Sequence, residues 1–168
     1  MNELNQLIGT WKLLSFRILF DDGDVEYPMG PDAVGYILYS AAGYMSGQLM
    51  QPGRPKFSAV RTSVAERGIG TPEEIVAAFN GYFSYCCRVE ADARQRKLTH
   101  RVIACQLPDW EGRTLERFWR FEDGGNRLTL TSAPLVINGK AATNQLAFQR
   151  EPDTFIATHA ARMEGVPS

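Results

Sequence analysis

The sequence contains few of the residues from which metal and cofactor sites are built. Its 168 residues include only two histidines, His100 and His159, which lie far apart without the spacing of metal ligands. No glycine-rich phosphate loop stands between an expected strand and an expected helix. We therefore expect no metal and no cofactor.

Cysteine is also scarce, and its three positions are Cys86, Cys87 and Cys105. Adjacent residues of a strand point to opposite faces, so Cys86 and Cys87 cannot form a disulfide with each other without strain. Residues 1–6 have neither the basic start nor the apolar stretch of an export signal. An odd number of cysteines without such a signal predicts free thiols and a cytoplasmic protein.

The chain lacks both an excess of charge of one sign and a long apolar run. A formal net charge of −1 argues against nucleic acid and against an anionic membrane surface as partners. The longest stretch without a charge, residues 33–53, contains four glycines and alternates between apolar and polar residues. It therefore does not predict a transmembrane helix.

Turn residues and short apolar segments are abundant instead. Fifteen glycines and 11% aromatic residues favour strands and turns over a helical bundle. Residues 51–70, with several prolines and glycines and no regular period, predict a long loop. Segments bounded by turn residues predict strands at 11–20, 25–27, 34–39, 44–50, 82–91, 97–105, 113–121, 127–132 and 143–150.

One helix is predicted between the strands, at residues 71–80. Thr71 has the position of an N-cap, Pro72 follows at the first helical position, and Glu74 completes a capping box. Ile75 and Phe79 share one face of this helix. A short helix with one apolar face beside a barrel is expected to cover an open end.

The order of these elements predicts an all-β fold. Sequential strands joined by short turns indicate a closed antiparallel up-and-down β-barrel of about eight to ten strands, with one short helix capping an end. Such a barrel has room for one small ligand. The chain fits a single domain, residues 1–168, with the barrel at about 7–150 and a tail at 151–168. Residues 156–163 have the pattern of a short helix.

Gly9 and Trp11 predict how the barrel begins. A glycine lets the backbone bend close to the barrel floor, and an indole two positions later points inward and plugs that end.

Several segments together resemble the bacterial and fungal lipocalin-like domain family, a calycin-type β-barrel. They are Leu7-Ile8-Gly9-Thr10-Trp11-Lys12-Leu13, Gly35-Tyr36-Ile37 with Tyr44-Met45-Ser46, Phe79-Asn80-Gly81-Tyr82-Phe83-Ser84-Tyr85, Thr99-His100-Arg101-Val102, Pro108-Asp109-Trp110-Glu111-Gly112 and Arg127-Leu128-Thr129-Leu130. The resemblance implies a cytoplasmic scaffold for binding small molecules, often encoded beside natural-product pathways, and brings no shared catalytic signature.

The last predicted strand departs from the family pattern, because Leu146-Ala147-Phe148-Gln149-Arg150 lacks the expected Leu-Thr-Trp. Arg150 nevertheless occupies the place where lipocalin-type barrels hold an arginine over the floor tryptophan. The resemblance therefore implies a cation–π contact between Arg150 and Trp11.

Alternation predicts which residues face the barrel interior on three successive strands. The expected inner sets are Phe83, Tyr85, Cys87 and Val89; Leu98, His100, Val102 and Ala104; and Leu115, Arg117, Trp119 and Phe121. Cys105 is expected on the outer face. A single β-bulge would invert part of a strand.

Three polar residues in these inner sets, Tyr85, His100 and Arg117, are the catalytic candidates. A histidine transfers protons near neutral pH, an arginine holds a carboxylate or an enolate-like oxygen, and a tyrosine hydroxyl orients a carbonyl. The alternatives are that His100 and Tyr85 are core residues, and that Arg117 lies at the rim and pairs with Glu116 or Glu90.

Further residues are candidates for lining a ligand cavity: Tyr36, Tyr39, Met45, Gln48, Phe83, Val102, Trp110 and Trp119. Both faces of segment 34–39 are apolar, so its pattern does not choose between Tyr36 and Tyr39. Trp110 either folds over the mouth of the barrel or packs its own loop onto the barrel wall.

These features predict a protein that binds a small, largely apolar or amphipathic ligand, as a monomer or homodimer. The alternative is a cofactor-independent isomerase or cyclase that acts on a polyketide- or terpenoid-like intermediate. A third class, a structural or protein-binding barrel, would need a packed interior and an exposed apolar patch.

Overall fold

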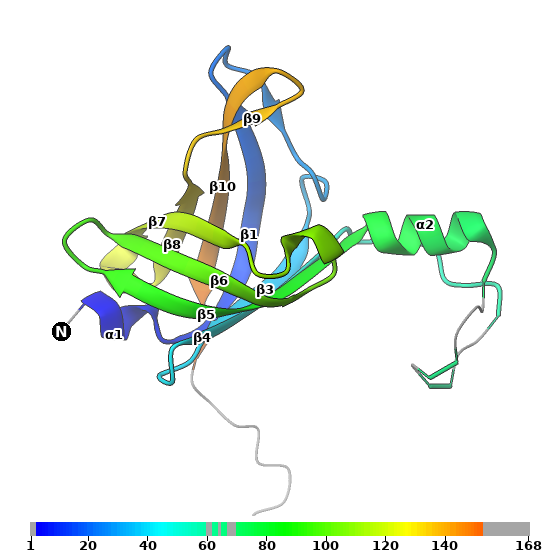
Figure 1. The fold of residues 1–168 in the computed structure, drawn as a ribbon, viewed down its shortest axis with the longest axis horizontal. Coiled ribbons are helices and arrows are strands. Elements are labelled where there is room, and N and C mark those ends of the chain that lie inside the picture. The colour runs from blue at the N-terminus through cyan, green and yellow to red at the C-terminus, as the bar shows by residue number, and fades with distance from the viewer. Residues whose placement is uncertain (1–2, 60–61, 64, 67–69, 153–168) are drawn as a thin grey trace, which may run out of the picture.

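The computed structural model describes residues 3–59, 62–63, 65–66 and 70–152, and the structural statements below concern these residues. The predicted helix at 156–163 lies outside them. Ten antiparallel strands form one sheet in the order β2-β1-β3-β4-β5-β6-β7-β8-β10-β9, and an additional pairing of β1 with β10 closes it (Figure 1).

The closed barrel consists of the eight strands that remain when the flanking strands β2 and β9 are set aside. They are β1 (Gly9–Phe20), β3 (Val34–Tyr39), β4 (Tyr44–Met50), β5 (Tyr82–Asp92), β6 (Lys97–Cys105), β7 (Thr114–Glu122), β8 (Arg127–Ser132) and β10 (Lys140–Arg150). The prediction of a closed antiparallel barrel is confirmed.

The two flanking strands are β2 (Val25–Glu26) and β9 (Leu135–Ile137). They pair with the far halves of β1 and β10, and the four strands rise together beyond the barrel rim at the top of Figure 1. The sequence did not predict β9, because three residues are too few to show an alternating pattern.

The barrel floor is formed around Trp11, which is fully buried. Its Nε1 donates a hydrogen bond of 2.9 Å to the carbonyl of Leu7, the last residue of helix α1 (Glu3–Leu7). The Arg150 guanidinium lies 4.0 Å from the indole ring centroid, which confirms the predicted cation–π contact. Arg150 also donates to the carbonyl oxygens of Gln6 and Ile8.

Gly9 is required at this floor for two reasons. Its φ of +134° is strained for other residues, and a Cβ atom there would lie 2.8 Å from Arg150 Nη1. The clash that the glycine avoids is therefore with the arginine that covers the tryptophan.

A β-bulge changes the predicted faces at the end of β6. Cys86 pairs with Ala104 while Cys87 pairs with Val102, so Ile103 is the extra residue. The alternation inverts after it: Ala104 is exposed, and Cys105 packs against the core. The predictions that Ala104 faces inward and Cys105 outward are wrong for this reason. All three cysteines are free thiols, as predicted.

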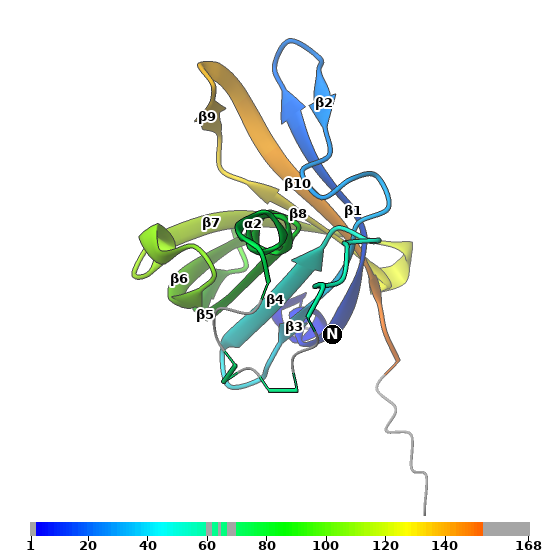
Figure 2. The same cartoon turned by 90° about the vertical axis from the view of Figure 1, so that its right-hand side faces the viewer.

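Helix α2 (Pro72–Asn80) has the predicted cap, with Thr71 and Glu74 forming a capping box. It does not cover an end of the barrel, because none of its residues is buried and Phe79 is 46% exposed. Only Gly81 separates α2 from β5, so the helix continues outward from that strand, as Figures 1 and 2 show. The shorter helix α1 closes the opposite, floor end.

Among the described residues, no helix is both long enough and apolar enough to span a membrane.

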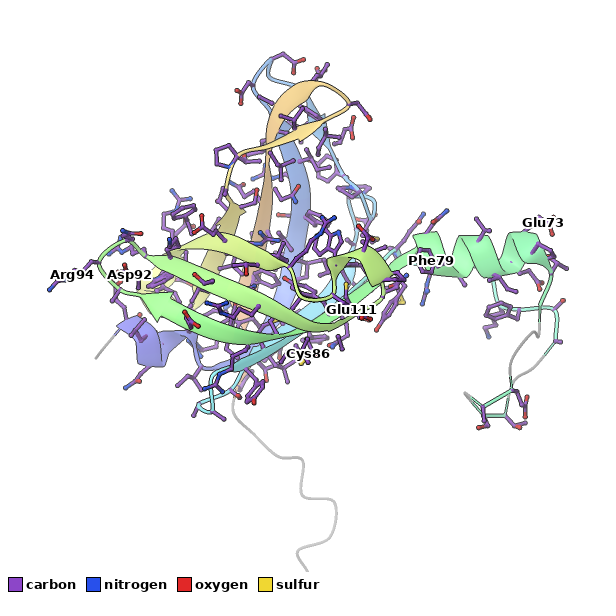
Figure 3. All side chains as sticks on the ribbon, viewed as in Figure 1. Glu73, Phe79, Cys86, Asp92, Arg94 and Glu111 are labelled. Atoms are coloured by element: carbon purple, nitrogen blue, oxygen red, sulfur yellow. The ribbon has the colours of Figure 1, made fainter. Side chains whose placement is uncertain are left out.

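The floor contact can be tested with Arg150→Leu. We expect it to lower the free energy of unfolding by about 1–3 kcal/mol, because it removes a cation–π contact and leaves carbonyl groups without donors. Chemical denaturation measures this. Arg94→Leu is the control, since Arg94 projects from the turn at the far left of Figure 3 and is exposed. Equal stabilities of the two variants would contradict the role of Arg150.

Candidate functional site

The barrel interior contains a pocket at the end away from α1. Its mouth lies beside the short 3₁₀ helix η1 (Pro108–Trp110), near the junction of α2 with the barrel, where Figure 3 labels Glu111 and Phe79. The pocket has a free volume of about 50 Å³. Its aromatic lining residues are Phe16, Tyr36, Phe83, Tyr85, Trp110 and Phe148.

Two other polar side chains, Arg117 and Asn144, line the same pocket. Arg117 comes from the inner face of β7, where alternation between Leu115 and Trp119 directs it inward. Its Nη1 donates a hydrogen bond of 2.9 Å to the backbone carbonyl of Glu116. The predicted alternative, a rim ion pair of Arg117, is not formed: the Glu116 carboxylate pairs with Lys97 and that of Glu90 with Arg101.

Tyr85 lies next to Arg117 in the pocket wall. Burial raises the pKa of Tyr85 to about 12, although the charge of Arg117 and a hydrogen bond to it act in the opposite direction. The phenol is therefore neutral at physiological pH and can donate a hydrogen bond. Phe83 packs against it at a centroid distance of 5.2 Å.

His100 lies beneath the pocket and does not line it. It is 0% exposed, and its Nε2 is 3.1 Å from the hydroxyl oxygen of Tyr39. Burial, together with the positive charge of Arg117, lowers the pKa of His100 to about 3. The imidazole is thus neutral at physiological pH, which disfavours proton transfer by His100 in this arrangement.

The other ring nitrogen of His100 has no partner of its own. Nδ1 is buried and makes no hydrogen bond within the described structure. Each tautomer leaves one hydrogen of the pair unpaired: the Nδ1 hydrogen when the Tyr39 hydroxyl donates to Nε2, and the hydroxyl hydrogen when Nε2 donates.

The structure brings the three catalytic candidates together. The rings of Tyr85 and His100 are 6.4 Å apart, and the charge of Arg117 acts on both. Tyr39, predicted as a ligand contact, is a fourth member of this group. Its pKa is raised well above the usual value by burial, and then by the nearby Tyr85.

The predicted ligand-lining residues occupy three places. Tyr36, Phe83 and Trp110 line the pocket, and Trp110 meets Phe83 edge to face at a centroid distance of 5.4 Å. The residues buried in the core instead are Tyr39, Met45, Val102 and Trp119. Gln48 alternates with the buried residues Gly47 and Leu49, donates to Ser46 Oγ, and borders a separate groove on the outer surface of β4 and β5.

Segment 34–39, which the sequence left undecided, directs Ile37 and Tyr39 inward. Tyr36 is 42% exposed and reaches only the edge of the pocket. The prediction did not include the pocket residues Phe16, Leu49, Asn144, Leu146 and Phe148. The alternation of residues along 144–148 could have identified Asn144, Leu146 and Phe148. Phe16, in contrast, follows a β-bulge between Leu13 and Ser15, which the sequence pattern does not show.

Within the part of the chain that the structure describes, no three His, Cys, Asp or Glu side chains come together as a metal site would require.

A closed antiparallel barrel of eight strands, plugged at one end by a tryptophan and with an apolar-walled pocket at the other, defines a class of small β-barrels with an interior pocket. Comparison with known families agrees with this class, because the lipocalin-like domain family matches residues 8–151. The chain belongs to the lipocalin-like domain family. A comparison with curated proteins finds no match.

The buried, neutral state of His100 makes a prediction about pH. In the unfolded chain its pKa is near 6.5, and in the folded barrel it is about 3. Below pH 6.5 the imidazole of the unfolded chain binds a proton, whereas that of the folded protein does not. His100 therefore lowers the free energy of unfolding as the pH falls, by up to about 1.4 kcal/mol per pH unit.

The matched variant is His100→Gln, which keeps a polar group near Tyr39 and cannot titrate. We expect the free energy of unfolding of the wild type to fall more steeply than that of the variant between pH 6.5 and pH 4. Carboxylates titrate equally in both proteins. Parallel stability curves would show that His100 is accessible to protons in the folded state.

Proposed function

We propose that this protein binds a small, largely apolar molecule inside its barrel. The observation that supports the proposal is the pocket itself, in which an apolar, mainly aromatic wall surrounds a few polar groups. Apolar walls with a small number of polar groups that fix orientation are the usual form of a small-molecule site. Membership of the lipocalin-like family is consistent with this function.

The size of the pocket indicates how a ligand enters. Its volume of about 50 Å³ holds only a few water-sized groups, so a larger ligand requires the mouth to widen. Trp110 is the natural part to move, because it lies on the 3₁₀ helix between β6 and β7 and forms no rung of the barrel. Its movement would break the contact with Phe83 and leave the strand pairing intact.

An isomerase or cyclase reaction in the same pocket is the second function to consider. Arg117 and Tyr85 lie side by side as donors and can polarise a carbonyl group or stabilise an enolate-like oxygen. The low pKa of His100 and its place beneath the pocket leave this reaction without an evident base. Binding is therefore the function that the geometry supports best.

The site can be tested by filling it with Leu146→Trp, on the pocket wall. We expect the variant to bind the neutral fluorescent probe N-phenyl-1-naphthylamine about tenfold more weakly or worse, because the indole occupies the space of the probe. Ile103→Trp is the control, since Ile103 is 55% exposed on the outer face. Fluorescence titration measures the affinity, and circular dichroism checks the fold.

Unchanged binding by a folded Leu146→Trp variant would place the probe outside the barrel. Wild-type protein that binds no apolar probe, and carries no small molecule in native mass spectrometry, would contradict the proposed function itself.

The role of the mouth can be tested with Trp110→Ala. We expect probe association to become at least about tenfold faster in stopped-flow fluorescence, since removal of the indole opens the route that closure otherwise limits. Trp110→Phe keeps an aromatic ring against Phe83 and should stay close to the wild-type rate. Equal rates in all three proteins would mean that the ligand enters elsewhere.

A further inference from the structure

Arg117 places a charged side chain in the pocket wall. An arginine keeps its proton under all physiological conditions, so this side chain brings a permanent positive charge into a largely apolar space. Arg117 is half-buried there, and taking a charge even partly out of water costs free energy unless an opposite charge or several acceptors replace the water.

No counter-charge for Arg117 is present among the described residues. None of their acidic side chains lies within ion-pair distance of the guanidinium, and the two partners that the sequence suggested, Glu116 and Glu90, are bound to Lys97 and Arg101 on the outer face. The residues paired with Arg117 on the neighbouring strands, Leu98 and Ser132, are both buried and uncharged.

The contacts that Arg117 does make are with neutral oxygens. Its protein partners are the backbone carbonyl of Glu116 and the Tyr85 hydroxyl. The other arginines that meet aromatic rings, such as Arg54 with Tyr82 and Arg88 with Tyr44, do so away from this pocket. The positive charge in the pocket is therefore not neutralised within the described structure.

Tyr85 adds a second donor beside this charge. Because burial keeps its phenol protonated at neutral pH, the guanidinium and the hydroxyl together present hydrogen-bond donors to the same side of the pocket. A carboxylate has two acceptor oxygens and the opposite charge, and it matches the planar fork of an arginine. A neutral carbonyl or hydroxyl would leave the charge uncompensated.

We propose that the ligand of this barrel is an aromatic or polyunsaturated carboxylic acid whose carboxylate pairs with Arg117 and accepts from Tyr85. This inference rests on the proposed function, since it names the ligand class of the same pocket. The aromatic walls enclose the apolar part, which extends toward Trp110 at the mouth.

The test compares two isosteric ligands, cinnamate and cinnamamide, by isothermal titration calorimetry at neutral pH. They have the same shape and differ in charge. We expect the wild type to bind cinnamate about 10- to 100-fold more tightly, the range for hydrogen bonds to charged groups in a partly buried site.

Arg117→Met keeps much of the side-chain length and removes the charge. We expect it to lose the preference for cinnamate while N-phenyl-1-naphthylamine, which has no negative charge, still binds. Arg117→Lys should restore part of the preference as a point charge. Arg101→Met is the control, because Arg101 pairs with Glu90 on the outer face, and it should behave as wild type.

The outcomes separate this inference from the proposed function. Equal affinities of the wild type for acid and amide, or an unchanged preference in Arg117→Met, would overturn the carboxylate assignment. Binding of N-phenyl-1-naphthylamine in the same experiments would still support the proposed binding function. Failure of all three compounds to bind the wild type would instead count against the binding function. If Arg117→Met does not fold, the wild-type comparison and Arg117→Lys still decide.

Discussion

The barrel closes through the antiparallel pairing of β1 with β10, which runs from Trp11–Arg150 to Phe20–Ala142, and the contact between Arg150 and Trp11 stabilises the floor end of that pairing. The guanidinium stacks on the indole at 4.0 Å and donates to backbone carbonyls that precede β1. One side chain thereby links the last strand to the chain that leads from α1 into β1 and to the buried Trp11. Gly9 permits this arrangement, because a Cβ atom at position 9 would clash with Nη1 of Arg150.

The position of the pocket follows from this closure. Between the plugged floor and the open end lies a packed layer that includes Met45, Leu98 and Trp119, together with the Tyr39–His100 pair. The aromatic pocket lies above that layer, where the wall carries Tyr85 and Arg117. Because burial keeps His100 neutral, Arg117 is the charged side chain in the pocket wall.

Much of the fold could be predicted from local pattern. The hairpin 34–50 and the capped helix at 72–80 form at the predicted residues, because turn residues and the capping box of Thr71 and Glu74 act over a few positions. The inward placement of Tyr85, His100 and Arg117 was also predicted, since alternation holds along those parts of β5, β6 and β7. Where it failed, at Ala104 and Cys105, a bulge had inserted one residue.

The sequence by itself therefore determined the barrel class, the strand order along the chain and the floor residues, which depend on short-range periodicity and on Gly9, Trp11 and Arg150. Only the tertiary structure decided that α2 projects from the barrel, that His100 is sealed beneath the pocket, and that Arg117 has no counter-charge among the described residues. These facts depend on which strands meet across the barrel and on how deeply each side chain is buried. Such long-range relations set the dielectric environment of a charged group, and no local pattern encodes them.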